Sequence, residues 1–162
     1  AATLKRGFNL VSGGFGVSID QLREFRKGFD ELVAKENLNP NVQVSTQRAV
    51  YVTESEADAR AAVEQAKWNM RVTLSLRNDY ERVEKGHAVA VPFDGEPDTD
   101  DLLERYMVIG TPQTCVKRIE ALRDAMGINH FNASFWFGDM EHDKVLRSMR
   151  LFAEEVMPRF KD

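Results

Sequence analysis

The fold is decided by one stretch of sequence, VQVSTQRAVYVT, which runs from Val42 to Thr53. Apolar and polar residues alternate along it, the pattern of a strand whose successive side chains point to opposite faces of a sheet. We therefore predict a strand over 42–53, with Gln43, Ser45 and Gln47 on one face. Strands covered on both faces of a parallel sheet usually read as nearly continuous apolar runs. These polar residues therefore either face a bound ligand or lie uncovered.

A strand and a helix precede this stretch. The short apolar run 8–12 is predicted as a first strand. Ser18 with Gln21 three residues later forms a capping box. Apolar residues at helical spacing follow it, so the sequence predicts a helix over 19–36 that ends in the segment 37–41, which contains Pro40.

Helical patterns also follow the central strand. A second capping box, Thr53 with Glu56, starts an alanine-rich helix over 54–71, and the pattern predicts that 72–85 is helical as well. The segment 86–99 carries prolines, a glycine and several acids, so we predict an exposed excursion there. A short helix over 100–107 is expected after it.

The C-terminal third shows one more helix, one strand and a last helix. Thr111 caps a helix with Pro112 at its first position, and Gly127 ends that helix. A strand is predicted over 130–137, and Asp139 is expected to cap the last helix. The predicted buried stripe of that helix consists of Val145, Met149, Phe152, Val156 and Phe160.

These elements predict one α/β domain over residues 1–162, in which three strands alternate with helices. Helices of this length between strands imply parallel pairing and right-handed crossovers. Such a sheet has two open edges, and no local feature of the sequence protects them.

Composition excludes several classes of protein. Of the 162 residues, 43% are apolar and 30% are charged, with a net charge of -4 in which both signs are mixed. This charge pattern argues against nucleic-acid binding. No apolar run is long enough to span a bilayer and no secretory signal is visible, so we expect a cytoplasmic protein. The single cysteine, Cys115, and three scattered histidines predict neither a disulfide nor a metal site.

Four local sequences together resemble the bacterial-luciferase-like family of flavin-dependent monooxygenases. They are the opening Ala1-Ala2 followed by Gly7, the segment Val108–Gln113 leading into a helix, the strand His130–Phe135, and the last helix, which ends in Leu151-Phe152-Ala153-Glu154-Glu155-Val156-Met157-Pro158. The four occur in the family's order over the whole chain.

The resemblance implies a (β/α)₈ TIM barrel, of which this chain corresponds to the C-terminal part: the end of the fifth helix and strand–helix units six to eight. A complete barrel needs about 200 residues or more. The resemblance further implies that reduced flavin and O₂ oxidise a small organic substrate, with flavin mononucleotide (FMN) or a related flavin or deazaflavin as cofactor. In the family, the N-terminal strands supply a catalytic histidine and many flavin contacts. No catalytic residue is therefore assigned here, and the active site is expected to be incomplete on this chain alone.

Candidate cofactor-binding residues come from barrel position, since chemistry occurs at the C-terminal ends of the strands. The resemblance points to Ser12, Gly13 and Gly14, where backbone N–H groups without nearby Cβ atoms admit a flavin or its phosphate. The simpler interpretation is a flexible turn. Trp136 is the candidate wall of an apolar pocket for the flavin ring or substrate, together with its two phenylalanine neighbours. The alternative is core packing, because alternate residues of a strand face opposite sides.

Two further polar residues have open assignments. His142, near the start of the last helix, is interpreted as a surface or capping residue rather than a catalytic one. Arg48 points away from the polar face of its strand. It either pairs with a helix acid, which is the simpler interpretation, or holds an anion.

Two other functions stay open at this point. One is a non-catalytic α/β domain that forms a homodimer through its open sheet, in place of pairing with an N-terminal half. The other is a phosphate- or nucleotide-binding domain that uses the loop 12–16.

Overall fold

The computed structural model describes residues 2–14, 16–39 and 42–161. Parts of the expectations above fall on Ala1, Phe15 and the segment 40–41, which lie outside the described residues. The elements in chain order are α1 (Ala2–Lys5), β1 (Leu10–Gly13), α2 (Ile19–Glu36), β2 (Val44–Val52), α3 (Glu56–Arg77), β3 (Arg82–Glu84), β4 (His87–Val89), α4 (Thr99–Asp101), η1 (Leu102–Tyr106), β5 (Val108–Gly110), α5 (Pro112–Met126), β6 (His130–Ser134), α6 (His142–Leu151), η2 (Phe152–Val156) and η3 (Met157–Phe160).

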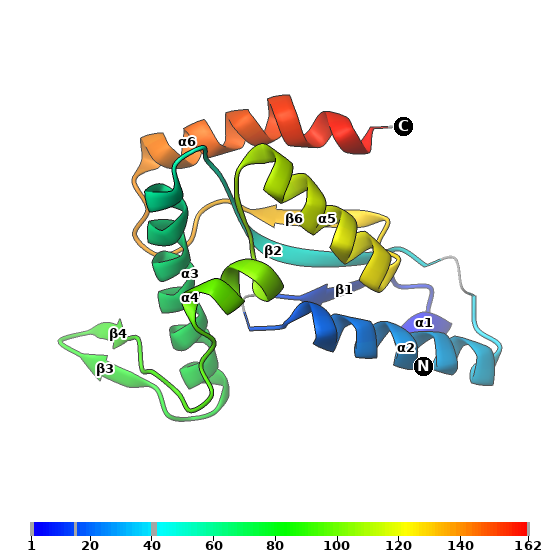
Figure 1. Ribbon diagram of the computed structural model, residues 1–162. Helices are drawn as coiled ribbons and strands as arrows, with labels where there is room; N and C mark the ends of the chain where they lie inside the picture. Colours follow the sequence, from blue (N-terminus) through cyan, green and yellow to red (C-terminus); the bar gives the residue numbers. More distant parts are fainter. Residues whose placement is uncertain (1, 15, 40–41, 162) are drawn as a thin grey trace.

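The main sheet is parallel and is built around β2 (Figure 1). Strands β1 and β6 both pair with the first part of β2, and β5 pairs with its last three residues. The predicted parallel α/β class agrees with this sheet, but the predicted number of strands is wrong. The sequence analysis missed β5, because three residues, Val108–Gly110, are too few to show an alternating pattern.

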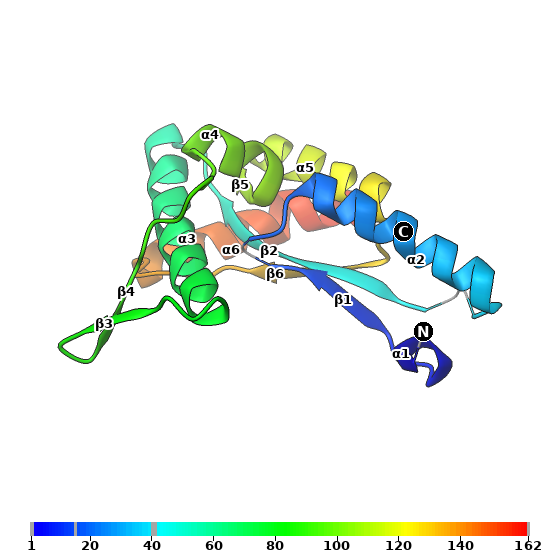
Figure 2. The same ribbon diagram turned by 90° about the horizontal axis from the view of Figure 1, so that it is seen from below.

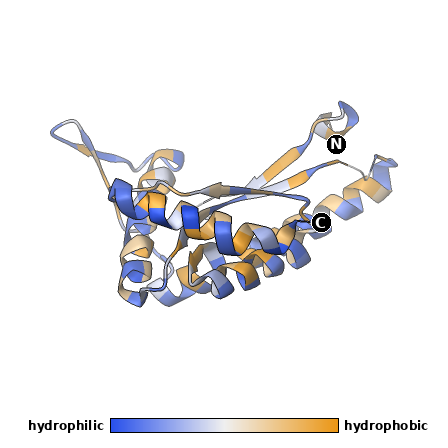
Figure 3. Ribbon diagram, turned by 90° about the horizontal axis from the view of Figure 1, so that it is seen from above, coloured by the Kyte–Doolittle hydropathy of each residue, from blue (hydrophilic) through white to orange (hydrophobic). Residues whose placement is uncertain are grey.

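Helices cover one face of this sheet along its length. Helices α2 and α5 and the C-terminal helical segment pack on the even-numbered side chains of β2, including Val44, Val50 and Val52. In Figure 2, α2 and α5 lie on one side of strands β1, β2 and β6. These helices carry apolar and polar residues in stripes, as helices with one side on a sheet do (Figure 3).

The opposite face is covered only in part. Helix α3 packs against Ala49 and Tyr51, near the end of β2, together with Ile109 of β5. Farther along the same face, Gln47 is exposed and the side chain of Val11 is 68% exposed. Of the polar residues predicted on this face of β2, Gln47 therefore lies open, whereas Ser45 is buried and donates a hydrogen bond to the backbone oxygen of Leu10.

The helix ends follow local sequence signals, with two corrections. Both bonds of the Ser18–Gln21 capping box are present, and Thr111, Pro112 and Gly127 bound α5 as predicted. The expected Thr53–Glu56 box is wrong, because Ser55 accepts the hydrogen bond from Asp58 N that caps α3.

The last helix begins later than predicted. Glu141 rather than Asp139 precedes α6, and the backbone N–H of Asp139 donates to the side chain of Gln65. Its predicted buried stripe is correct at Val145 and Val156 but wrong at Met149, which is 44% exposed.

The region 72–85 is helical only as far as Arg77. Asp79 adopts a positive φ of 56°, and the chain then forms the β3–β4 hairpin, whose turn residues Lys85 and Gly86 also have positive φ. Figures 1 and 2 show this hairpin projecting from the body of the molecule. We expected a helix there because 72–77 continues the pattern of α3.

Candidate functional site

The C-terminal ends of β1 and β6 bring the predicted cofactor residues to one edge of the sheet. The register aligns Gly13 with Gln47 of β2, and Gln47 with Asn132 of β6. Since all three strands are parallel, the turn that follows β1 and the residues that follow β6 leave the sheet at the same edge. Trp136 lies four residues beyond Asn132. The structure therefore brings the Ser12–Gly14 turn and Trp136 to the same edge, on strands either side of β2.

The turn at the end of β1 depends on its glycines. Gly13 and Gly14 have φ values of 108° and 131°, a region that other residues rarely adopt. A Cβ on Gly13 would lie 2.6 Å from Oγ1 of Thr46, whereas a Cβ on Gly14 would meet nothing within 4 Å. Gly13 is thus required for close packing on β2, and Gly14 presents open backbone.

The three aromatic residues after β6 have different environments. Phe135 packs edge-to-face on Phe152, with ring centroids 5.2 Å apart, and Phe137 is 3% exposed. Trp136 is 58% exposed, and its ring lies 5.5 Å from that of His142. The two phenylalanines are therefore core residues, and Trp136 alone presents an aromatic surface at this edge.

Arg48 is buried without a carboxylate partner. It is 1% exposed, and its Nη1 donates to the backbone oxygens of Gly14 and Gln47 at 3.2 and 3.3 Å. Among the described residues no acid lies within ion-pair distance of it, so the expected pairing with a helix acid is wrong. Burial lowers the pKa of Arg48 to about 10. Nη2 of Arg48 and Oγ1 of the neighbouring Thr46 are buried without hydrogen-bond partners in the described part of the chain.

A polar pocket lies between the starts of α3 and α6, and the sequence analysis missed it. Its volume is about 110 Å³, and Tyr51, Asp58 and Lys144 line it. Burial, and secondarily the nearby charge of Asp58, raise the pKa of Tyr51. A hydrogen bond to Glu141 is the main cause that raises the pKa of Lys144, which bridges Glu141 and Asp58 at 3.2 and 3.5 Å. Only the contact of α3 with α6 creates this site, so no local sequence signal could have found it.

The described residues contain neither an activated cysteine nor a cluster of metal ligands. Cys115 is fully buried, and burial raises its pKa to about 12, so it is not an activated thiol. Within residues 2–14, 16–39 and 42–161, no cluster of three or more histidine, cysteine or acidic side chains could hold a metal ion. In the same residues, no helix is long and apolar enough to cross a membrane.

Comparison with known proteins identifies the family of the chain. The model of the luciferase-like monooxygenase family matches residues 1–130. The chain belongs to this family.

Individual relatives agree with the assignment to luciferase-like monooxygenases. The alkanal monooxygenase alpha chain of Photobacterium leiognathi is 39% identical over 54 residues, which is 33% of this chain and 15% of the relative. A monooxygenase from Streptomyces bottropensis superimposes with a TM-score of 0.67 at 18% identity, over 99% of this chain and 44% of its own.

A second solved structure has the same arrangement. The oxygenating constituent of the 3,6-diketocamphane monooxygenase of Pseudomonas putida, a type II Baeyer–Villiger monooxygenase in complex with FMN, superimposes with a TM-score of 0.65 at 18% identity. The match covers 98% of this chain and 44% of that one. At these identities the likeness shows the fold. The luciferase-like chain thus spans less than half the length of the solved structures that it matches.

Proposed function

We propose that this luciferase-like chain forms part of the site of a flavin-dependent monooxygenase, with FMN or a related flavin or deazaflavin at the C-terminal edge of the sheet. The observation that carries the proposal is that the open Ser12–Gly14 turn and the exposed Trp136 both follow strands at the C-terminal edge of the sheet, in a member of this family. When bound, the flavin supplies the reaction of its reduced ring with O₂ that oxidises an organic substrate.

The residues at this edge fit a flat aromatic group with polar substituents. The exposed indole of Trp136 offers a stacking surface, and aromatic pairs gain energy beyond the area they bury. A Cβ at Gly14 would meet nothing within 4 Å, so a ligand can approach the backbone of this residue, whose oxygen already accepts a hydrogen bond from Nη1 of Arg48.

The open polar face provides further hydrogen-bonding groups. Gln47 is exposed, and Asn132 and Ser134 of β6 follow the same alternation beside it. In this proposal they line the side of the site that faces the barrel interior, where the four described strands supply one wall. The remaining strands of a barrel are needed to enclose the flavin and to exclude water from it.

Binding of flavin to the chain tests the proposal. We expect oxidised or reduced FMN to quench tryptophan fluorescence saturably, and Trp136→Ala to weaken this binding by about tenfold through the loss of stacking. Trp68→Ala is the matched control, because Trp68 is similarly exposed, at 43%, but lies on α3. It is expected to bind flavin as the unmodified chain does.

Two results would contradict the assignment. If the purified chain binds neither redox state of FMN nor a deazaflavin, it does not form part of a flavin site on its own. If Trp68→Ala and Trp136→Ala weaken binding equally, the flavin is not held at this edge.

Self-association is a second candidate function, favoured by the sheet. In the described residues β1 and β6 each pair only with β2, and the side chains of Phe8 and Val11 are 57% and 68% exposed. Two copies that joined these edges would cover them. Light scattering at micromolar concentration tests this candidate, and a monomeric mass would exclude it.

A further inference from the structure

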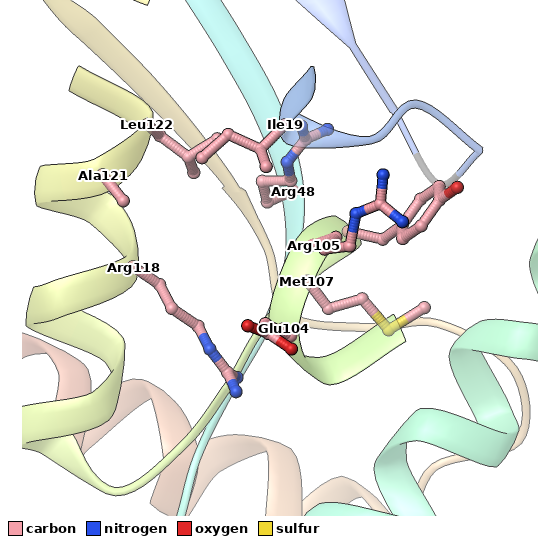
Figure 4. Close-up of a pocket in the computed structure, with 9 residues that line it drawn as sticks. Ile19, Arg48, Glu104, Arg105, Met107, Arg118, Ala121 and Leu122 are labelled. Atoms are coloured by element: carbon pink, nitrogen blue, oxygen red, sulfur yellow. The ribbon is translucent and has the colours of Figure 1, made fainter. Parts of the chain in front are cut away.

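Arg48 connects β2 to the turn that ends β1. Its side chain lies on the helix-covered face of β2 and is 1% exposed. Nη1 donates hydrogen bonds to the backbone oxygens of Gly14 and Gln47, at 3.2 and 3.3 Å. Figure 4 shows that the guanidinium points away from Glu104 of η1 and toward the chain that precedes α2. The arginine therefore reaches from the central strand to the open turn.

This turn needs a support because it consists of glycines. Glycine loses more conformational freedom on folding than any other residue. Gly13 and Gly14 have φ values of 108° and 131°, and a Cβ on Gly14 would meet nothing within 4 Å. A Cβ on Gly13 would lie 3.1 Å from Nη1 of Arg48, so this glycine also lies close to the guanidinium. The hydrogen bond from Arg48 holds the carbonyl of Gly14 on the side of the sheet.

The fold gains little stability from a charge at position 48. Burial of a cation without a carboxylate partner is costly, and Nη2 of Arg48 has no hydrogen-bond partner in the described part of the chain. Replacement of buried charged groups by apolar side chains of similar volume is often neutral or stabilising. A single nitrogen, Nη1, makes both hydrogen bonds. The turn therefore requires a long side chain that ends in a donor, rather than the whole guanidinium.

We infer that Arg48 is a positioning residue of the proposed flavin site. It fixes the carbonyl of Gly14 and thereby orders the turn before a ligand arrives. A site that is ordered in advance binds its ligand more tightly, because less conformational entropy is lost on binding. The inference rests on the proposed function, since the order of this turn affects binding only if the flavin lies against it.

The backbone order of Gly14, measured without flavin, tests the hydrogen bond itself. In ¹⁵N relaxation of the unmodified chain we expect Gly14 to have the order parameter of rigid backbone, about 0.85. Arg48→Met places an apolar side chain of similar length there and is expected to lower this value below about 0.6. Its midpoint of urea unfolding is expected to be unchanged or higher, because a buried charge is removed.

Titration with FMN, followed by tryptophan fluorescence, tests the positioning role. Arg48→Met is expected to weaken FMN binding by about tenfold, through the loss of a hydrogen bond from a charged group. Arg48→Lys keeps one donor nitrogen on a long side chain. It is expected to restore the order of Gly14 and to bring the affinity within about threefold of that of the unmodified chain.

Arg118→Met is the matched control. Arg118, on α5, is a half-buried arginine that also donates to a backbone oxygen, that of Ile109 in β5. The same substitution there removes the same kind of hydrogen bond without touching the turn. The order of Gly14 and the affinity for FMN are both expected to stay unchanged.

Several results would overturn the inference. A rigid Gly14 in Arg48→Met would show that the arginine does not hold the turn, whether or not FMN binds. A mobile Gly14 with unchanged FMN affinity would show that the turn does not contact the ligand. Equal losses in Arg48→Met and Arg118→Met would indicate a general loss of stability. If the unmodified chain binds no FMN, the proposed function fails, and the positioning role fails with it even where Gly14 loosens.

Discussion

Arg71 of α3 and Glu96, 25 residues later, are joined by two hydrogen bonds, from Nε at 2.6 Å and from Nη2 at 2.5 Å. Lys67, one turn earlier on α3, adds an ion pair to the same carboxylate at 3.1 Å. The Glu96 side chain is only 11% exposed. The end of the segment that contains the β3–β4 hairpin is therefore held against α3 by a largely buried carboxylate.

Replacement of this carboxylate is expected to destabilise the chain. Glu96→Gln should lower the free energy of unfolding by about 2 kcal/mol at neutral pH, because it weakens hydrogen bonds to charged groups. Glu84→Gln removes an exposed partner of Arg82 and should change stability by less than about 0.5 kcal/mol. Urea unfolding measures both. Equal effects of the two variants would contradict the assigned role of Glu96.

The stabilisation by Glu96 should also depend on pH. The hydrogen bond from Arg71 is the main cause that lowers the pKa of Glu96 below the ordinary value of 4.5. A lowered folded-state pKa means that the contribution is fully present above 4.5 and is lost as the pH falls through the folded-state value. Urea unfolding of the unmodified chain and of Glu96→Gln should therefore give free energies that converge at acid pH. A constant difference across this range would show that ionisation of Glu96 is not involved.

The hydroxyl of Ser148 should stabilise the end of β2. Its Oγ accepts a hydrogen bond from the buried backbone N–H of Val52 at 2.8 Å, which links α6 to β2. Ser148→Ala leaves that N–H unpaired and should cost about 1–3 kcal/mol in chemical denaturation. It should also speed amide exchange at Val52. Ser134→Ala, at a half-buried position of β6, should have little effect on either measurement.

Cys115 should be unreactive in the folded chain. Burial raises its pKa to about 12, so about one thiol in ten thousand is ionised at pH 8. A thiol reagent such as Ellman's reagent is therefore expected to react slowly with the native chain and rapidly in denaturant. Because the folded pKa is raised, this burial stabilises the fold below the ordinary value of 9.0, and the contribution is lost as the pH rises toward 12. Rapid labelling of the native chain would contradict the buried position of the thiol.

Two glycines should respond in opposite directions to the same substitution. Gly138 has a φ of 62°, and a Cβ there would lie 2.9 Å from the backbone oxygen of Gln65. Gly138→Ala should therefore cost about 2 kcal/mol or more. Gly28 lies within α2 with open space around it, and Gly28→Ala should stabilise the chain by about 0.5–1 kcal/mol. Thermal unfolding measures both, and a shift of the same sign in the two variants would contradict the assigned conformations.

Local signals explain which parts of the fold could be predicted. Helix α2 has both a clear apolar period and a capping box, so its bounds agree with the sequence analysis. Strand β5 has three residues and no readable pattern, and it forms because β2 lies beside it. Met149 was expected in the core, but the buried face of α6 passes through Val145 and Ser148, at a spacing of three, which leaves Met149 exposed.

Part of the candidate site could likewise be predicted from the sequence, and part of it could not. The positions of Ser12–Gly14 and Trp136 at one edge could be predicted, since they follow strands of a parallel sheet. The lack of an acidic partner for Arg48 could not be predicted from the sequence, because it depends on where η1 lies. This element places Glu104 near Arg118 rather than near Arg48. The pocket at Tyr51 likewise depends on a contact between helices that are distant in sequence.

The segment 78–99, which contains the β3–β4 hairpin, starts and finishes beside the same helix, α3. Thr99, at its far end, donates to Glu64 of α3 at 3.1 Å, and Asp100 pairs with Arg60 at 3.1 Å. Insertion or deletion of residues at the exposed β3–β4 turn therefore need not move β5 or α5. We expect this turn to be the place where related sequences differ most in length, and where a tag or a reporter domain can be inserted without disturbing the sheet.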